Sequence, residues 1–337
     1  MLTIMIKLSK GMAKRRVSHG ARPHLTAELD ASKLRVTKAL HPSKLPLAEE
    51  LAFGSHTTDH ILQVRWTADE GWFAPQIVPY QKLALDPAAA VLLYGFEYFE
   101  GMKAKPGYSL YLRLVIIATN SNLGVTAPTA ALLYCVACPV GLYFSAGFKA
   151  INLEATASAV ATRAWPGGAG NYKIGGNYAS CIAPEKAAKA RGFQQLLWLF
   201  GDDDRITEAG TMNLFVVLQI GDEERFKLVT PPLDGMILPG VTRDCVLSLV
   251  RERLAPAGWI VSERDICMTE VVHAAVAGKL IEAFGTGTAA IVSPIRTIKY
   301  RDRLVHCGLS RHQNASAITA LMKGWIEARQ YAVEEHC

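Results

Sequence analysis

The sequence has no run of about 20 uncharged apolar residues, the length that a membrane-spanning helix needs. Its seven cysteines are an odd number scattered over 337 residues, which excludes a small disulfide scaffold and favours a reducing compartment. Half of the residues are hydrophobic and 20% are charged, so a disordered chain is excluded as well. The length suits one large or two medium domains with a buried core.

Acidic residues are missing from the first 27 positions, which hold six Lys or Arg residues among apolar ones. The net charge of +6 belongs to this segment, because residues 28–337 contain 30 basic and 30 acidic residues. The balanced body argues against nucleic acid as a partner. Residues 1–27 have the composition of a mitochondrial transit peptide. A basic arm on a cytoplasmic protein is the alternative interpretation.

Hydrophobic patterning predicts a mixture of strands and helices. Strands are expected at 52–63, 77–80, 110–118, 130–140, 148–153, 195–200, 213–219 and 289–292. Helices are expected at 86–94, 179–191, 242–254, 268–278 and 315–331. Because the two kinds alternate without a steady βαβ rhythm, an α+β fold is favoured over a doubly wound sheet.

Several familiar catalytic motifs are lacking: there is no G-x-S-x-G elbow, no P-loop and no H-E-x-x-H. Residues 285–290 match G-x-G-x-x-A, but a dinucleotide site needs a strand before this motif and a helix after it. Here the stretch 271–283 has helical character and a strand is expected afterwards. A tight loop that offers backbone N–H groups to an anion remains an attractive interpretation.

Two clusters of residues whose side chains could ligate a metal ion are better explained as structural features than as metal sites. Cys135 and Cys138 form a C-x-x-C without a second pair, inside an apolar run, where residues three apart in a strand face opposite sides. Buried core cysteines are the favoured interpretation. His56, Asp59 and His60 lack a third cluster, which favours a hydrogen-bonded turn. We therefore expect no metal site.

The most informative segment is the glycine-rich stretch 166–178, which contains Lys173 and Tyr178. A lysine flanked by glycines and tyrosines, with no acid nearby, can be partly buried, and burial yields a nucleophilic amine. Such an amine can form a Schiff base with an aldehyde cofactor, although a solvated lysine in such a loop is equally common. Glu208 could keep a pyridine nitrogen protonated. The segment 235–243 ends at a helix start, which suits a phosphate.

These three segments together resemble the branched-chain amino acid aminotransferases, which are fold-type IV pyridoxal phosphate enzymes. The sequences of the motifs are most similar to those of fungal members. Further matching segments lie at 53–60, 71–72, 99–104, 109–113, 123–125, 284–289 and 326–331. The resemblance implies a two-domain α+β fold and a homodimer. It also implies ping-pong transfer of the amino group of Leu, Ile or Val to 2-oxoglutarate, which gives branched 2-oxo acids and glutamate.

The resemblance assigns the cofactor contacts. Lys173 would hold pyridoxal 5′-phosphate as a Schiff base and act as general base and acid. Glu208 would pair with the pyridine nitrogen, and Tyr178 would lie beside the phenolic oxygen. The phosphate would be held at the start of the helix after residue 240 and at one threonine, through Gly240, Val241, Thr242 and Thr288.

The resemblance also assigns the substrate contacts. An apolar pocket for branched side chains would be walled by Phe53, Tyr94 and Tyr143. The substrate carboxylate would meet Thr288 and Ala289, with Thr211 nearby. The side-chain carboxylate of glutamate would meet Tyr111 and Arg113. Leu123 and Val125 would belong to a loop that reaches into the site of the partner subunit.

The chain departs from the family pattern after Ala104, because Lys103-Ala104 runs almost directly into the strand 109–113. In the family, a block of several elements intervenes and includes an arginine that clamps the cofactor phosphate. Losing this charge-assisted contact removes about 1.5–3 kcal/mol. We therefore expect an incomplete small domain. The redox cysteine pair of some animal members is replaced by Ala290 and Ser293.

The predicted organisation comprises a targeting segment at 1–27, an arm at 28–50, a small α/β domain at 51–141 truncated between 104 and 105, an interdomain loop at 142–151 and a large cofactor-binding domain at 152–337. Competing hypotheses are a catalytically impaired or silent splice or gene-model variant of the same enzyme, and another fold-type IV activity. The latter would be a D-amino acid aminotransferase or an aminodeoxychorismate lyase, which Tyr111 and Arg113 disfavour.

Overall fold

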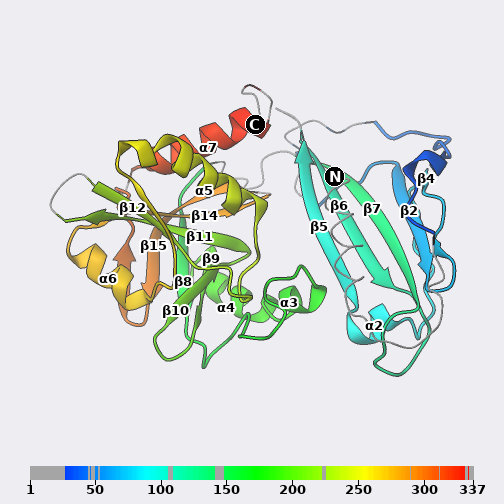
Figure 1. Ribbon diagram of the computed structural model, residues 1–337, viewed down its shortest axis with the longest axis horizontal. Helices are drawn as coiled ribbons and strands as arrows, with labels where there is room; N and C mark the ends of the chain where they lie inside the picture. The colour runs from blue at the N-terminus through cyan, green and yellow to red at the C-terminus, as the bar shows by residue number, and fades with distance from the viewer. Residues whose placement is uncertain are drawn as a thin grey trace, which may run out of the picture.

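The computed structural model describes residues 27–44, 46, 50–51, 54–104, 109–140, 148–221, 225–288, 290–310, 312–330 and 333. Two separate sheets stand side by side, with helices gathered mainly around the second one (Figure 1). This arrangement confirms the predicted α+β class. No helix among the described residues is long and apolar enough to cross a membrane.

The first sheet is built by the N-terminal part of the chain in the order β1-β4-β2-β7-β6-β5, with β3 paired to β2. Its strands are β1 (Arg35–Val36), β2 (His60–Thr67), β3 (Gly71–Trp72), β4 (Gln76–Pro79), β5 (Glu97–Ala104), β6 (Ser109–Ala118) and β7 (Ala130–Val140). The 3-10 turn η1 (Ala31–Lys33) and helix α2 (Ala90–Tyr94) accompany them. Strand β5 forms one edge of this sheet and pairs antiparallel with β6.

The second sheet closes on itself, because β10 pairs with both β9 and β11. Its strands are β8 (Ile151–Thr156), β9 (Gln195–Phe200), β10 (Arg205–Ala209), β11 (Met212–Ile220), β12 (Arg225–Thr230), β13 (Ile260–Glu263), β14 (Leu280–Gly287), β15 (Ile291–Tyr300) and β16 (Arg303–His306). The helical elements are α3 (Gly175–Ala179), α4 (Ile182–Ala190), α5 (Val241–Arg253), η3 (Ala255–Ala257), α6 (Met268–Val276) and α7 (Ala317–Gln330). Strands β12 and β13 extend the ring at β11, and β16 pairs with β15.

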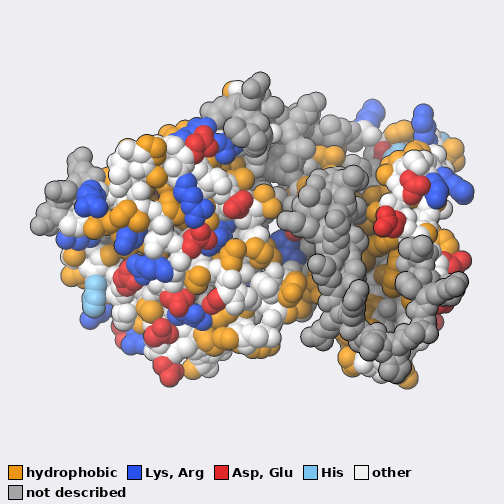
Figure 2. Space-filling view, viewed as in Figure 1, with side chains coloured by type: hydrophobic (Ala, Val, Ile, Leu, Met, Phe, Trp, Pro, Cys, Tyr) orange, Lys and Arg blue, Asp and Glu red, His pale blue; other side chains and the backbone are white. Residues whose placement is uncertain are grey.

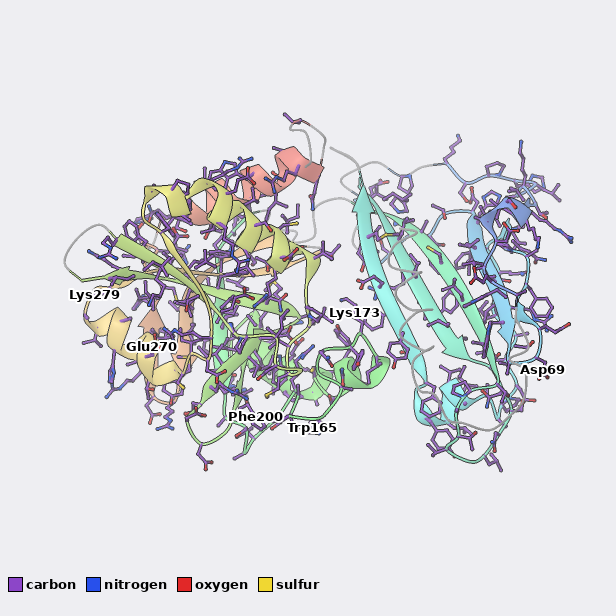
Figure 3. The ribbon with its side chains drawn as sticks, in the orientation of Figure 1. Asp69, Trp165, Lys173, Phe200, Glu270 and Lys279 are labelled. Atoms are coloured by element: carbon purple, nitrogen blue, oxygen red, sulfur yellow. The ribbon has the colours of Figure 1, made fainter. Side chains whose placement is uncertain are left out.

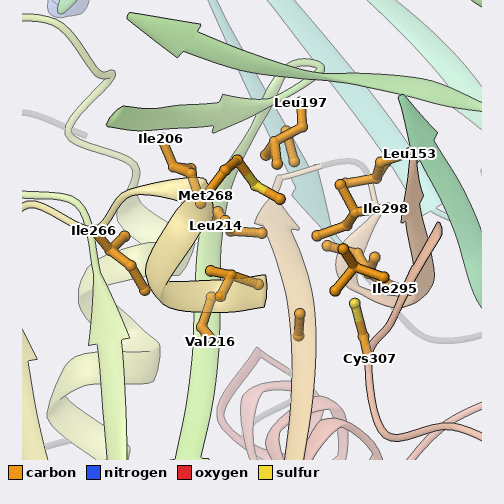
Figure 4. Packing of buried hydrophobic residues seen from close by; sticks show 14 of the residues in the cluster. Leu153, Leu197, Ile206, Leu214, Val216, Ile266, Met268, Ile295, Ile298 and Cys307 are labelled. Carbon is orange, nitrogen blue, oxygen red and sulfur yellow. The ribbon is translucent and has the colours of Figure 1, made fainter. Parts of the chain in front are cut away.

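Strand β11 shows why this ring is stable, because both of its faces are covered. Leu214 and Val216 point into the cluster inside the ring, which Figure 4 shows together with Met268 of α6. Phe215 and Val217, one residue out of phase, belong to a second cluster with α5 and α7. Apolar residues therefore occupy consecutive positions of the strand, as a strand buried on both faces requires.

A buried carboxylate fixes helix α7 against the ring. Glu282 of β14 is 3% exposed and accepts from the backbone N–H groups of Ile318 (3.0 Å) and Thr319 (2.9 Å) and from the Thr319 hydroxyl (2.7 Å). The first N–H groups of a helix have no acceptor within the helix. Here the carboxylate of Glu282, on a distant strand, is their acceptor. Basic and acidic side chains are interspersed on the visible outer face of this part of the chain (Figure 2).

Of the cluster His56, Asp59 and His60, the last two make structural hydrogen bonds, although His60 is the first residue of β2 and the three residues do not form one turn. The backbone N–H of Ala39 donates to Nε2 of His60 at 2.9 Å, and the N–H of Ser43 donates to Asp59 at 3.0 Å. These contacts fasten the segment before β2 to the start of that strand. The C-x-x-C cysteines are also free thiols: Cys138 is buried and Cys135 is half-buried.

Two predicted elements differ from the structure. A strand is expected at 52–63, but β2 begins only at His60 and runs to Thr67, and residues 54–59 form no strand. The sequence pattern predicts helical structure over 271–283, but α6 ends at Val276 and residues from Leu280 form β14. Gly278, with a φ of 67°, turns the chain between them. Gly285 and Gly287 therefore lie at the end of β14, where they pair with Ser293 and Ile291 of the antiparallel strand β15. The strand-turn-helix context of a dinucleotide site is absent at this motif.

Candidate active site

The lysine of the glycine-rich loop is held against the edge of the first sheet. The backbone N–H of Phe99 in β5 donates to the carbonyl of Lys173 at 3.0 Å, and Tyr98 forms an antiparallel bridge with Ile174. Figure 3 shows Lys173 between the second sheet and β5. The edge strand left open by the sheet order thus captures the loop and sets where the amine stands.

Two aromatic rings surround the amine. The Nζ of Lys173 lies 5.5 Å from the ring centroid of Phe99 and 5.9 Å from that of Tyr178, and the two rings are 4.9 Å apart. Burial lowers the pKa of Lys173; Glu100 opposes this effect, and Arg113 adds to it. An amine with a lowered pKa is deprotonated, and so nucleophilic, more often than a solvated lysine.

Strand β6 brings a second cation to the same rings. The guanidinium carbon of Arg113 lies 4.7 Å from the Phe99 centroid and 5.2 Å from that of Tyr111. Tyr111 is buried, and its hydroxyl lies where a Cβ on Gly101 would come within 1.8 Å. Gly101 is therefore required by close approach: only a residue without a Cβ lets the tyrosine ring lie across β5. The ring of Phe99 lies against both Arg113 and Lys173 and so connects the two cations.

Glu208 of β10 is a fully buried carboxylate. Its Oε2 lies 2.6 Å from Nη1 of Arg163, and its Oε1 accepts from the N–H of Leu238 at 3.1 Å and from Asn213 at 3.2 Å. Burial raises the pKa of this carboxyl, and Arg163 is the main opposing influence. Glu208 and Lys173 act on each other electrostatically, so the structure brings the two predicted residues into one site.

The segment before α5 meets the same carboxylate. Asn213 donates to the carbonyl of Leu238 at 2.8 Å, and its Oδ1 would lie 2.3 Å from a Cβ on Gly240. Gly240 is the N-cap residue of α5 and contributes no side-chain cap. The first N–H groups of the helix, at Val241 and Thr242, are therefore not covered by a capping side chain. A 13-residue helix with such a start favours an anion.

The predicted threonines gather where three strands end. Glu208 pairs with Asn213 across β10 and β11, and Asn213 pairs with Thr286 across β11 and β14. Thr211 lies in the turn before β11, and its carbonyl would be 3.8 Å from a Cβ on Gly287. Thr288 follows directly. The hydroxyl of Thr286 is buried without a hydrogen-bond partner among the described residues.

The structure connects Tyr94, Leu123 and Val125 differently. The Tyr94 hydroxyl donates to the carbonyl of Leu123 in the same chain, and the side chains of Leu123 and Val125 are exposed at 77% and 71%. Tyr94 at the end of α2 and Leu123 are therefore neighbours within one chain. Phe53, Tyr143 and Ala289 lie outside the described residues, so their predicted roles remain predictions.

Three residues of this site are not predicted from the sequence. Phe99 stands only within a matching segment, and no motif singles out Arg163 or Asn213. A basic residue inside the mostly apolar stretch before the glycine-rich loop is the only local signal for Arg163. Asn213 carries no local signal, because its partners Glu208 and Leu238 meet only in the folded chain.

The site fits pyridoxal phosphate in its donor set. An amine of lowered pKa, a buried carboxylate and a helix start without a side-chain cap match the aldehyde, the ring nitrogen and the phosphate. Tyr178 adds a phenol, whose pKa is raised by burial and lowered in part by Arg163. Glycines at 170 and 240 approach neighbouring groups so closely that a Cβ would meet the carbonyl oxygen of Met236 at 2.4 Å and Oδ1 of Asn213 at 2.3 Å.

Comparison with known proteins places the chain in a family. Residues 98–298 match the class IV amino-transferases. The cytosolic branched-chain-amino-acid aminotransferase of Saccharomyces cerevisiae is 43% identical, over 92% of this chain and 96% of that protein. The mitochondrial enzyme of the same yeast is 44% identical, over 90% of this chain and 91% of that protein.

Solved structures show the same fold. The branched-chain aminotransferase of Thermoproteus uzoniensis with norvaline superposes with a TM-score of 0.62 at 21% identity, covering 81% of this chain and 96% of that chain. The T.th. branched-chain amino acid aminotransferase with pyridoxamine 5′-phosphate gives 0.61 at 18% identity, covering 80% and 95%. On the sequence identities with the yeast enzymes, the chain belongs to the branched-chain-amino-acid aminotransferase family, within the class IV aminotransferases.

Proposed function

We propose that this chain binds pyridoxal 5′-phosphate and transfers the amino group of Leu, Ile or Val to 2-oxoglutarate. The observation that carries the proposal is one constellation: the amine of Lys173, the Glu208–Arg163 ion pair and the start of α5 share a single site. The yeast relatives are named for this activity, and one solved structure of the fold carries pyridoxamine 5′-phosphate.

The residues divide the work of holding the cofactor. Lys173 would hold it through its amine, Glu208 would keep a proton on the ring nitrogen, and Tyr178 would contact the phenolic oxygen. The N–H groups of Val241 and Thr242, with Thr288, would hold the phosphate. When bound, the cofactor supplies an electron sink for cleavage of the Cα–H bond of the substrate.

Lys173 itself is the general base and acid in this scheme. Once the substrate amine has replaced it on the cofactor, the neutral amine of Lys173 would take the proton from the substrate Cα as a base and would then give that proton up as an acid. Phe99 and Tyr178 lie against the amine on two sides, and burial lowers the pKa of Lys173 toward the neutral form that the first step needs. Glu100 lies close enough to act electrostatically in the opposite direction.

The substrate end of the site would be formed by strand β6. Arg113 and Tyr111 face Phe99 and can receive a carboxylate, which suits the side chain of glutamate in the second half-reaction. Apolar walls at Phe53, Tyr94 and Tyr143, with Thr211, Thr288 and Ala289 at the α-carboxylate, complete the proposed pocket. Arg113 and the aromatic walls favour this substrate pair over a D-amino acid or aminodeoxychorismate.

A homodimer is the proposed assembly, in which Leu123 and Val125 of one copy reach the site of the other. Their high exposure in a single chain supports this proposal. We keep the division into an arm (28–50), a small domain (51–141), a loop (142–151) and a large domain (152–337). For residues 1–27, mitochondrial targeting is proposed from their basic composition. The yeast relatives comprise both a cytosolic and a mitochondrial enzyme.

A second candidate is an impaired or silent version of this enzyme. The match to the yeast cytosolic enzyme runs over 364 positions but covers 92% of the 337 residues, about 310, so roughly fifty positions have no counterpart in this chain. We propose that this block is missing after Ala104, where β5 passes to β6 through residues 105–108. No residue of the chain is assigned to the phosphate-clamping arginine that the block carries in the family.

An amino-transfer assay decides between these candidates. The purified chain is given pyridoxal phosphate, 2-oxoglutarate and each of Leu, Ile, Val and D-Ala, beside Lys173→Ala and beside a chain with the block restored. Turnover of the branched substrates that is lost in Lys173→Ala supports the first candidate. Turnover only with the block restored supports the second. Turnover of D-Ala alone refutes the assignment.

A further inference from the structure

A buried guanidinium lies between two residues of the proposed site. The side chain of Arg163 is 3% exposed, and its Nη1 lies 2.6 Å from Oε2 of Glu208, which is 2% exposed. The same guanidinium donates to the carbonyl of Gly170 at 3.5 Å. Burial raises the pKa of Tyr178, and the charge of the guanidinium lowers it in part. Arg163 therefore contacts the carboxylate of the site directly and acts on its phenol electrostatically.

Stability alone is a poor reason for such a pair. Removing two charges from water costs several kcal/mol each, and apolar replacements of buried pairs are often neutral or stabilising. The loop is also shaped around Arg163: a Cβ on Gly170 would meet the Met236 carbonyl at 2.4 Å, so this loop packs directly on the segment before α5. Its carbonyl is thereby fixed as an acceptor for the guanidinium.

The chemistry of Glu208 supplies a reason. A carboxylate can hold a proton on a pyridine nitrogen only if it is itself ionised. Burial favours its neutral form, and the groups that oppose burial are Arg163, the N–H of Leu238 and Lys173. Lys173 cannot serve as a permanent counter-charge, because the proposed function uses it as a neutral amine. Tyr178 and Cys181, the neighbouring titratable groups, carry no positive charge.

We propose that Arg163 is a positioning residue that keeps Glu208 ionised, so that this guanidinium sets the contact that Glu208 makes with the ring nitrogen of the cofactor. The role of Glu208 at the ring nitrogen of the cofactor rests on the proposed function. The effect of Arg163 on the ionisation of Glu208 does not rest on it, because this effect is a property of the chain without cofactor.

The first arm of the test uses the cofactor-free protein. Unfolding by urea is followed at about pH 5 and about pH 8 for the native chain, Arg163→Gln, Arg163→Lys and Arg163→Gln/Glu208→Gln. Without the guanidinium the pKa of Glu208 rises further in the folded state, so stability is lost as pH rises from the unfolded value. The unfolding constant of Arg163→Gln should therefore increase about tenfold more than that of the native chain between the two pH values.

The remaining variants make this arm decisive. Arg163→Lys should show a smaller pH effect, and the double variant should show none, because it lacks the titrating carboxyl. Arg191→Gln is the matched control, since Arg191 pairs with Glu154 at 2.6 Å but is itself 54% exposed, and it should leave the pH dependence unchanged. Equal losses at both pH values in Arg163→Gln would overturn the proposal, because they would indicate a packing role.

The second arm compares binding of pyridoxal phosphate with binding of its 1-deaza analogue, in which carbon replaces the ring nitrogen. Arg163→Gln should weaken the native ligand about tenfold more than the analogue. Equal weakening of both ligands would contradict the proposal. If the native chain binds neither ligand, the proposed function fails, while the first arm still decides the role of Arg163.

Discussion

Gly101 offers a sharp test of the site geometry. A Cβ at this position would lie 1.8 Å from the Tyr111 hydroxyl oxygen, 2.5 Å from Cζ and 3.0 Å from Cε2. Ordinary contacts begin near 3.4 Å, so the ring of Tyr111 has to move by more than 1 Å in Gly101→Ala. Tyr111 is buried and stacks with Arg113, so this movement also disturbs the proposed carboxylate site.

The cost follows from overpacking. Forcing a methyl group into a packed region typically costs about 1–3 kcal/mol. We expect Gly101→Ala to lose this much stability in urea unfolding. In a Tyr111→Phe background, which removes the atom at 1.8 Å but keeps Cζ, the loss should be smaller, and in Tyr111→Val it should nearly vanish. For turnover, kcat/KM should fall more for glutamate than for leucine.

A matched control is Gly324→Ala in the middle of α7, where nothing lies within 4 Å of the added Cβ. This variant should gain about 0.5–1 kcal/mol, because alanine is the better helix residue. If Gly101→Ala is as stable as the native chain and keeps its substrate profile, then Tyr111 does not lie across β5 and the proposed glutamate contact is wrong.

Three further outcomes are expected. In the cofactor-free protein, Lys173→Met should be more stable than the native chain at neutral pH, because the folded state binds a proton at Lys173 less readily than the unfolded state. This gain in stability should shrink as the pH rises toward the pKa of the lysine in the unfolded chain. If urea unfolding shows no gain, the burial of this amine is contradicted. Glu282→Ala should cost about 1.5–3 kcal/mol in urea unfolding, because the start of α7 loses a charged acceptor; an unchanged midpoint would argue against the cap. Replacing Cys135 and Cys138 with serine should leave the response of activity to a thiol oxidant unchanged, since the two side chains face opposite sides of β7; protection by the double variant would reveal a redox pair.

The sequence predicts well those elements whose hydrophobic pattern is compatible with only one kind of secondary structure. The continuous apolar runs at 110–118, 130–140 and 195–200 form β6, β7 and β9, because strands of this length with few charges are buried on at least one face. The helices predicted at 242–254 and 315–331 begin and end within two residues of α5 and α7. Glycine and proline residues indicate most of the turns between these elements.

The misassigned stretch shows where local pattern fails. Residues 271–283 contain four alanines together with lysine, leucine and glutamate, a composition that favours a continuous helix. In the folded chain, Glu282 is needed in a strand, where it meets the start of α7, and β14 is needed between β11 and β15 to close the ring. Tertiary contacts from residues 30 or more positions away outweigh helix propensity.

The site is predictable only where a motif carries it. Lys173, Tyr178 and Glu208 stand in segments whose composition indicates a cofactor. Arg163 and Asn213 acquire their roles from partners that lie 45 and 25 positions away, Glu208 and Leu238, so no local pattern announces them. Contacts between these segments and the strands β10 and β11 decide such roles.

The central claim is that Lys173 is the residue that holds pyridoxal phosphate. The most direct measurement is reduction of the cofactor-loaded protein with borohydride, which fixes the cofactor on the amine that carries it, followed by peptide mass mapping. We expect a single modified peptide carrying the label on Lys173, and loss of the label in Lys173→Ala. Labelling of another lysine, or of none after saturation with cofactor, would contradict this account.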